Sequence, residues 1–338
     1  MPRITLAIAC TIASLALTWA FGIIAPSSAS AQTIPGISDP LTLSLIPEVP
    51  QPNGLFDVRL QSYSMGLDSA LVVWSIDGKE VQRGVGLKSL SARAGGVGSM
   101  STIHVSVVTV GTGTFNTSIV IRPADVALVW ESDTYTPPFY KGKALHSYNG
   151  AFKVIALPEF VDFSGKRINP KELIYSWSKN GEVQANASGY GKNTFITSQT
   201  SYLRPGEDIM VEVSAPRDNI VARRSVTISP IVPKIVFYEN SGLYGTLYEK
   251  SLLRSVNLVN DEVEIVAEPY FFSVPVRNSA ALSYSWKLNG QTVPSFQNRS
   301  GVILRKTGQA GASSIGVTIQ NSQKLLQGAN SAIIIRYE

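Results

Sequence analysis

Cysteine is almost absent from this chain. Among 338 residues there is one, Cys10, and it lies inside an N-terminal apolar run. The chain beyond that run therefore has no disulfide, no thiolate metal site and no thiol redox chemistry. Any domain in it must be stabilised by burial of apolar surface.

Histidine is scarce as well, with two residues, His104 and His146. A Ser or Cys nucleophile needs a histidine base within hydrogen-bond reach, and the sequence contains no Gly-x-Ser-x-Gly elbow and no His-Glu-x-x-His or calcium-loop pattern. We expect both histidines at the surface. The sequence predicts no enzyme, no catalytic residue, no cofactor and no metal site.

The sequence also contains no phosphate-binding loop motif. Gly84-Val85-Gly86 and Gly111-Thr112-Gly113 resemble such loops only in their glycines, because neither ends in Lys-Ser/Thr or precedes a helical pattern. We interpret both as hairpin turns.

The sequence also lacks a concentrated patch of charges of one sign. Charged residues make up 16% of the chain, and the net charge of +5 is spread along its length. Binding to a phosphate backbone requires a concentrated basic face, so nucleic acid is not expected as a partner. With 44% hydrophobic residues the chain has ample material for packed cores.

The N-terminus has the layout of a secretory signal. Arg3 precedes the apolar run 4–25, and Ala29-Ser30-Ala31 is a small-x-small site before Gln32. We predict that residues 1–31 are a signal peptide and that the mature chain is secreted or held at the cell surface. The run is long enough for an uncleaved membrane-anchor helix, and Cys10 as a lipid-modified residue is a third reading.

A tryptophan-bearing phrase occurs three times. Each copy is a short run rich in apolar residues containing the tryptophan, followed three residues later by Asp-Gly or Asn-Gly, the dipeptides suited to a tight hairpin turn. The copies cover residues 71–78, 174–181 and 282–290, with Trp74, Trp177 and Trp286 spaced by 103 and then 109 residues. That spacing is one β-sandwich length, and we expect the three indoles to anchor three cores.

A second repeated element follows each tryptophan by about thirty residues. It alternates aliphatic residues with period two, which places them on one face of a strand. The aliphatic sets are Ile103, Val105 and Val107; Ile209, Val211 and Val213; and Ile315, Val317 and Ile319. No stretch after the signal has the spacing of an amphipathic helix.

We therefore predict an all-β protein: three tandem immunoglobulin-like β-sandwich domains after an N-terminal apolar signal or anchor helix. The predicted domains are residues 38–123, 124–230 and 231–338. Their short, proline-bearing connections predict a semi-rigid rod. The second and third domains are the more alike, because residues 140–147 match residues 248–255 at an offset of 108, whereas the first domain lacks this insert.

The Trp-x-x-Asp/Asn-Gly phrase with its later Ile-x-Val-x-Val strand resembles the tandem immunoglobulin-like and polycystic-kidney-disease-type (PKD) repeats of bacterial surface proteins. PKD repeats continue the tryptophan strand with an acidic Asp-Phe-Gly-Asp-Gly turn, whereas here Ser-Ile-Asp-Gly, Ser-Lys-Asn-Gly and Lys-Leu-Asn-Gly follow. This favours the general immunoglobulin-like label. The resemblance implies adhesion, spacing or surface assembly and identifies no ligand.

The strongest binding candidate is an aromatic segment of the second domain that contains Tyr135, Phe139 and Tyr140, with Tyr148 beyond it. Exposed rings supply large, rigid contact area for a protein or glycan partner, although the same rings could instead cover a domain end or junction. Three hypotheses remain open: a structural and interaction rod for surface display or adhesion, a carbohydrate-binding module that uses this segment, and a subunit of a pilus or other polymer.

Overall fold

The computed structural model describes residues 41–111, 113–198, 203–306, 308 and 310–337. These residues form twenty-four strands and four single-turn 3-10 helices, and among them there is no α-helix. No helix in the described part is long and apolar enough to cross a membrane. The predicted signal or anchor in residues 1–31 lies outside the described residues.

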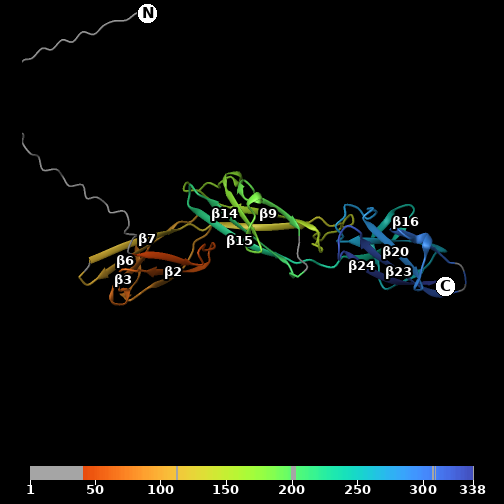
Figure 1. Cartoon of the computed structure of the whole chain (residues 1–338), viewed down its shortest axis with the longest axis horizontal. Coiled ribbons are helices and arrows are strands. Elements are labelled where there is room, and N and C mark those ends of the chain that lie inside the picture. The colour runs from red at the N-terminus through yellow and green to blue at the C-terminus, as the bar shows by residue number, and fades with distance from the viewer. Residues whose placement is uncertain (1–40, 112, 199–202, 307, 309, 338) are drawn as a thin grey trace, which may run out of the picture. The chain divides into compact units, whose positions relative to one another are not determined.

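The first pair of sheets has the strand orders β1-β2-β5 and β4-β3-β6-β7. Figure 1 shows β2, β3, β6 and β7 lying together in the orange part of the ribbon. Its elements are β1 (Thr42–Ile46), β2 (Leu55–Gln61), η1 (Leu67–Ser69), β3 (Leu71–Ile76), β4 (Lys79–Val85), β5 (Ser89–Arg93), β6 (Ser101–Thr109) and β7 (Gly113–Ile121).

The second pair has the orders β13-β9-β8 and β11-β10-β14-β15, and β12 also pairs with β10. Its elements are β8 (Asp125–Ser132), β9 (Ala151–Glu159), η2 (Pro170–Glu172), β10 (Ile174–Lys179), β11 (Glu182–Val183), η3 (Ala185–Ala187), β12 (Gly189–Tyr190), β13 (Thr194–Ser198), β14 (Glu207–Ala215) and β15 (Ile220–Ile228).

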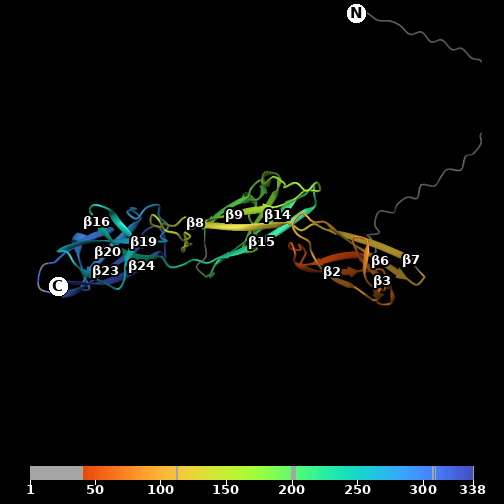
Figure 2. The same ribbon diagram turned by 180° about the vertical axis from the view of Figure 1, so that it is seen from behind.

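The third pair has the orders β17-β16-β19-β22 and β18-β24-β23-β20-β21. Figure 2 shows β16, β19, β20, β23 and β24 together from behind. Its elements are β16 (Lys234–Ser241), β17 (Gly245–Leu252), β18 (Ser255–Leu258), β19 (Glu262–Tyr270), β20 (Leu282–Leu288), β21 (Gln291–Thr292), η4 (Pro294–Phe296), β22 (Gly301–Arg305), β23 (Gly311–Asn321) and β24 (Gly328–Tyr337). Among the described strands, β18 and β24 are the one parallel pair.

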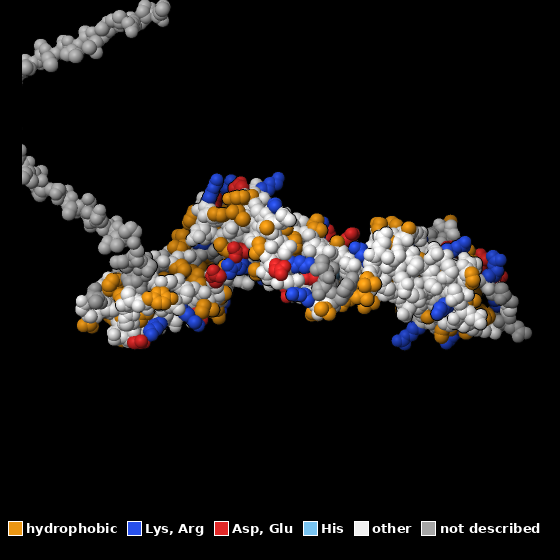
Figure 3. Space-filling model, in the orientation of Figure 1, with side chains coloured by type: hydrophobic (Ala, Val, Ile, Leu, Met, Phe, Trp, Pro, Cys, Tyr) orange, Lys and Arg blue, Asp and Glu red, His pale blue; other side chains and the backbone are white. Residues whose placement is uncertain are grey.

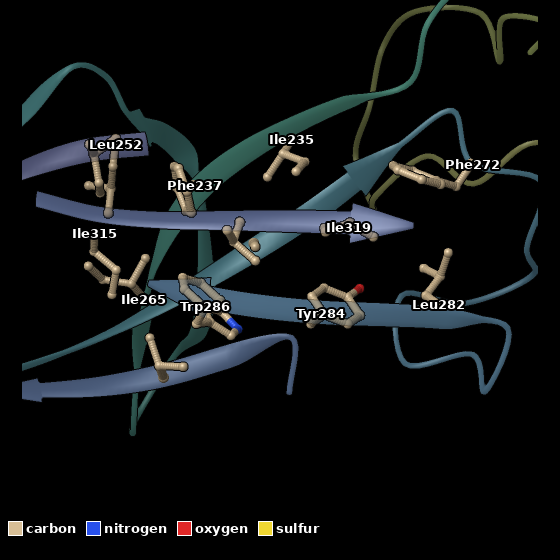
Figure 4. Packing of buried hydrophobic residues seen from close by; sticks show 14 of the residues in the cluster. Ile235, Phe237, Leu252, Ile265, Phe272, Leu282, Tyr284, Trp286, Ile315 and Ile319 are labelled. Atoms are coloured by element: carbon tan, nitrogen blue, oxygen red, sulfur yellow. The ribbon is translucent and has the colours of Figure 1, made fainter. Parts of the chain in front are cut away.

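Each pair of sheets encloses one hydrophobic core and is therefore a β-sandwich. The core residues run from Leu41 to Ile121, from Ala124 to Ile228 and from Ile235 to Ile335. The aliphatic residues predicted to face inward from β6, β14 and β23 are all buried, which confirms the period-two reading. Each core contains an indole with no exposed area, those of Trp74, Trp177 and Trp286; Figure 4 shows Trp286 among its neighbours in the third core.

Each indole also donates a hydrogen bond to a backbone carbonyl further along the chain. Trp74 Nε1 donates to Leu87 O (3.1 Å), Trp177 Nε1 to Lys192 O (2.8 Å) and Trp286 Nε1 to Arg299 O (2.7 Å). A buried N–H without an acceptor would destabilise the core. The bond therefore satisfies the one polar atom of the ring and fixes the loop that crosses between the sheets.

One glycine prediction needs correction. Gly84 and Val85 do not form a hairpin turn but are the last residues of β4, and β5 that follows belongs to the opposite sheet. The turn begins at Gly86, whose φ of +73° glycine adopts without strain. Strand β6 is joined to β7 by a hairpin at Gly111, as predicted.

Candidate binding site at the junction of the second and third sandwiches

Residues 133–150 connect β8 to β9 and are called the junction segment below. It contains all four aromatic residues proposed above for binding. Its start is bonded to the third sandwich by two backbone hydrogen bonds: Tyr135 N donates to Phe272 O (2.7 Å) and Phe271 N donates to Tyr135 O (2.8 Å). The segment therefore continues from one sandwich onto the next.

Its far half is bonded to the same neighbour. Ile231 N donates to His146 O (2.8 Å), the Ser147 hydroxyl donates to Phe271 O, and Gln327 Nε2 donates to Tyr148 O (2.7 Å). All five of these hydrogen bonds have a backbone carbonyl as acceptor, so the path of the chain contributes to the docking alongside the side chains that donate.

His146 corrects a prediction. Instead of lying at the surface it has no exposed area, and its ring packs edge-on against Phe152 of the second core, with ring centroids 4.8 Å apart. His104 is exposed on β6, as expected from its alternation with the buried face.

A carboxylate lies buried where the junction segment meets the third sandwich. Glu268 of β19 has no exposed area. Its Oε2 accepts a hydrogen bond from the Tyr135 hydroxyl (2.8 Å), and its Oε1 accepts from the Tyr248 hydroxyl (2.8 Å) and from Arg277 Nη1 (2.6 Å). The positive charge of Arg277 and two hydroxyl donors replace the water that the carboxylate loses on burial.

Burial and these contacts shift the pKa values of the neighbouring tyrosines and arginine. Burial, followed by the hydrogen bond to Glu268, raises the pKa of Tyr248 to about 12 and raises the pKa of Tyr135 well above its ordinary value. Burial works against the charge of Arg277, yet the hydrogen bond and the negative charge of Glu268, with smaller contributions from Tyr248 and Tyr135, together outweigh this and raise the pKa of the guanidinium. At neutral pH both tyrosines therefore stay protonated as donors.

Beside Glu268 three tyrosines of the third sandwich form an aromatic floor. The Tyr238 and Tyr270 hydroxyls are bonded to each other (2.7 Å), and both rings are buried. Tyr248 packs edge-on against Tyr238 with ring centroids 5.3 Å apart. Tyr140 of the junction segment packs edge-on against Tyr270 at 5.6 Å.

The floor opens into a cleft of about 480 Å³, which we call the tyrosine cleft. That volume lies within the usual range of small-ligand sites. One wall comes from the junction segment and the other from the third sandwich; the lining residues are Pro138, Phe139, Tyr140, Lys141, Tyr238, Thr246, Tyr248, Glu249 and Tyr270.

Phe139 on the rim is unfavourable for the fold in two ways. Its side chain is 87% exposed, and its φ of +63° lies in the left-handed region that bulky residues avoid. Strain of this kind persists where the surroundings impose it and is frequent at ligand contacts. Among the aromatic residues that line the cleft, Phe139 is the most exposed and so the most available to a partner.

The four predicted binding residues thus separate into two groups. Phe139 and Tyr140 line the cleft, whereas Tyr135 is bonded to Glu268 and packs on the third core, and Tyr148 accepts a bond from Gln327 through its carbonyl. Sequence reasoning missed Tyr238, Tyr270 and Glu268. The signal that was available for Tyr248 is its match to Tyr140 in the 108-residue repeat.

The described residues hold no cluster of three or more His, Cys, Asp or Glu side chains that could bind a metal ion. On the face shown in Figure 3, basic and acidic side chains are intermingled and do not separate by sign.

No family model matches the chain, and no curated protein sequence matches it. Several of the solved structures that match are arrays of immunoglobulin or fibronectin-III-like domains. Three N-terminal domains of the bacteriophage RB49 outer capsid protein Hoc match at 12% identity over 88% of this chain and 99% of that one, with a TM-score of 0.25. The central fibronectin-III array of RIM-binding protein matches at 12% identity over 87% and 95%, with a TM-score of 0.31.

A Bacteroides ovatus protein, SGBP-B of a mixed-linkage glucan utilisation locus in complex with a heptasaccharide, matches at 13% identity over 91% of this chain and 69% of that one, with a TM-score of 0.22. At such low scores these likenesses carry no argument about the ligand or activity of this chain.

Proposed function

We propose that this chain is an exported, non-enzymatic interaction protein. Its domains would be residues 38–123, 124–230 and 231–338, arranged as a stiff stalk for display or adhesion outside the cytoplasm, with the tyrosine cleft as the contact with a partner. Export is inferred from Arg3, the apolar run and the small-x-small site before Gln32.

The observation that supports binding best is Phe139. A phenylalanine that is 87% exposed and held at positive φ adds nothing to either neighbouring core. Aromatic residues in such positions dominate the energetics of protein interfaces, because they bring a large apolar area at a small loss of side-chain entropy.

A neutral glycan is the second candidate partner. The cleft combines apolar ring faces with the hydroxyls of Thr246 and of its tyrosines, and it carries one basic and one acidic residue, Lys141 and Glu249. A ligand with both apolar faces and many hydroxyl groups fits this mixture, since its polar groups keep partners on leaving water.

The binding test compares the exported chain with Phe139→Ala on a glycan array and on whole cells of the producing organism. If the cleft is the contact, the variant binds at least about tenfold more weakly. Tyr63→Ala, which removes a 98% exposed aromatic side chain from the first sandwich, is the matched control and keeps full binding. Equal binding by the wild-type chain and Phe139→Ala would contradict the assignment, and an intact mass that begins at Gln32 would support export.

A further inference from the structure

The two oxygens of Glu268 hold groups from different parts of the chain. Tyr135, on Oε2, belongs to the junction segment, whereas Tyr248 and Arg277, on Oε1, belong to the third sandwich. The carboxylate therefore bridges the two walls of the tyrosine cleft, since Tyr248 lines one wall and Phe139, four residues after Tyr135, lines the other.

We infer that Glu268 is a positioning residue: it docks the junction segment on the third sandwich through Tyr135, and the tyrosine cleft exists only in this docked state. The inference deepens the proposed function and rests on it for the cleft's role in binding. The docking itself can be measured without any ligand.

Burial gives this contact its strength. Glu268 has no exposed area, and among the residues that the structure describes Tyr135 is the one donor to its Oε2. If Tyr135 moved away, that oxygen would lose its donor inside the protein, which is far more costly than losing a hydrogen bond at the surface. The backbone bonds between Tyr135, Phe271 and Phe272 lie directly beside it and should open in the same event.

The test is native-state hydrogen exchange on the full chain. In Tyr135→Phe, which keeps the ring and removes the hydroxyl, the amides of Tyr135 and Phe271 should exchange about 10- to 100-fold faster. The matched control is Tyr175→Phe, which removes the hydroxyl of a fully buried tyrosine, bonded to Pro170 O, from the second sandwich. It should leave those two amides unchanged.

A double-mutant cycle distinguishes the direct contact between Tyr135 and Glu268 from a general loss of stability. Glu268→Gln removes the negative charge of the group that accepts the Tyr135 hydrogen bond. Adding Tyr135→Phe to Glu268→Gln should therefore accelerate exchange at Phe271 much less than Tyr135→Phe does in the wild-type chain. Equal acceleration in both backgrounds, or no acceleration at Phe271 in Tyr135→Phe, would overturn the inference. Should Glu268→Gln fail to fold, the comparison of Tyr135→Phe with Tyr175→Phe still decides.

The binding arm uses the same glycan array and cells as probes. Reduced binding by Tyr135→Phe, with normal binding by Tyr175→Phe, would support a cleft assembled by docking. Faster exchange in Tyr135→Phe with unchanged binding would overturn that link and leave the proposed function standing. If exchange shows normal docking in the wild-type chain but Phe139→Ala binds as well as the wild-type chain, the proposed function is wrong and the docking inference stands.

Discussion

Tyr175 places a further aromatic ring in the second core, two residues before Trp177 on β10. The ring has no exposed area and the hydroxyl donates to Pro170 O (3.0 Å). Burial raises the pKa of this phenol from 10.0 to about 12. In the third sandwich Tyr284, two residues before Trp286, donates to Arg277 O in the same way.

This shift predicts a loss of stability in alkali. Between about pH 10 and pH 12 the unfolded chain releases the Tyr175 proton while the folded chain keeps it. Stability from this group is thus complete below pH 10 and is lost as the pH rises through about 12. In Tyr175→Phe, the unfolding free energy should fall less steeply across this window, by up to about 1.4 kcal/mol per pH unit.

Urea unfolding followed by circular dichroism at several pH values measures this slope. At neutral pH Tyr175→Phe should be the less stable protein by about 1 kcal/mol, because it lacks the bond to Pro170. Tyr190→Phe, at a tyrosine that is 69% exposed, should match the wild-type slope. Parallel curves for Tyr175→Phe and the wild-type chain would show that this phenol does not titrate as described.

Single residues were predictable where local alternation decides burial. His104 follows from the period of β6, because its two neighbours in sequence face the core. His146 does not, since its carbonyl is bonded to Ile231, far along the chain, and nothing near it in sequence indicates burial. Glu268 was equally hidden: a carboxylate on a strand normally indicates a solvent-exposed face, and its three donors come from three separate segments.

At the scale of elements, the hairpin after each core tryptophan is the most regular feature. Asp77, Asn180 and Asn289 all have positive φ. Each donates its backbone N–H to a carbonyl of Thr102, Asp208 or Ser314, and its side-chain oxygen accepts the backbone N–H of that same residue. The Asp/Asn-Gly dipeptide therefore both makes the turn and ties it to the adjacent strand.

Two substitutions of Asn180 separate these roles. Asn180→Gly tolerates the φ of +53° and loses only the side-chain bonds to Asp208 and Glu207. Asn180→Ala loses the same bonds and adds left-handed strain, so it should be less stable than Asn180→Gly by about 1 kcal/mol. Urea midpoints of the two variants provide the measurement, and a more stable Ala variant would mean that the turn changes conformation.

The internal repeat predicted strands better than it predicted the segments between them. Residues 140–147 and 248–255 match in sequence, yet residues 245–252 form β17 whereas residues 140–147 form no strand. The physical difference is the neighbour: β17 pairs with β16, while within residues 140–147 the carbonyl of His146 accepts a backbone bond from Ile231, ahead of β16. A sequence match cannot show which chain segment supplies the hydrogen-bond partners.

At the scale of the whole molecule, side chains as well as backbone bonds join successive sandwiches. Between the second and third, the half-buried Tyr135 and the buried Ser147 and Gln327 bond across the junction. Between the first and second, a bond across the joint comes from Arg122, one residue after β7, whose side chain is 7% exposed. Its guanidinium donates to Asp218 O (2.7 Å) and Val161 O (3.2 Å) and lies 3.7 Å above the centre of the Phe163 ring.

A second arginine at the same joint provides the contrast. Arg223 pairs with Glu48 (2.7 Å) and with Glu212, but its side chain is 38% exposed. Exposed ion pairs contribute about 0–1 kcal/mol because water and salt screen them, whereas buried hydrogen bonds from a charged group contribute about 1.5–3 kcal/mol. The proline-bearing connection, from which a semi-rigid link was predicted, thus acts together with a contact that the sequence did not indicate.

We therefore expect Arg122→Ala to lower the local opening free energy at the amides of Asp162 and Asp218 by about 1.5–3 kcal/mol, as measured by native-state hydrogen exchange. Both amides bond within loops that face Arg122, to Lys166 O and Ala215 O. Arg223→Ala should change them by less than about 1 kcal/mol, and that small change should shrink further in high salt. If both variants open the joint equally, the exposed ion pairs and not the buried guanidinium hold the first two sandwiches together.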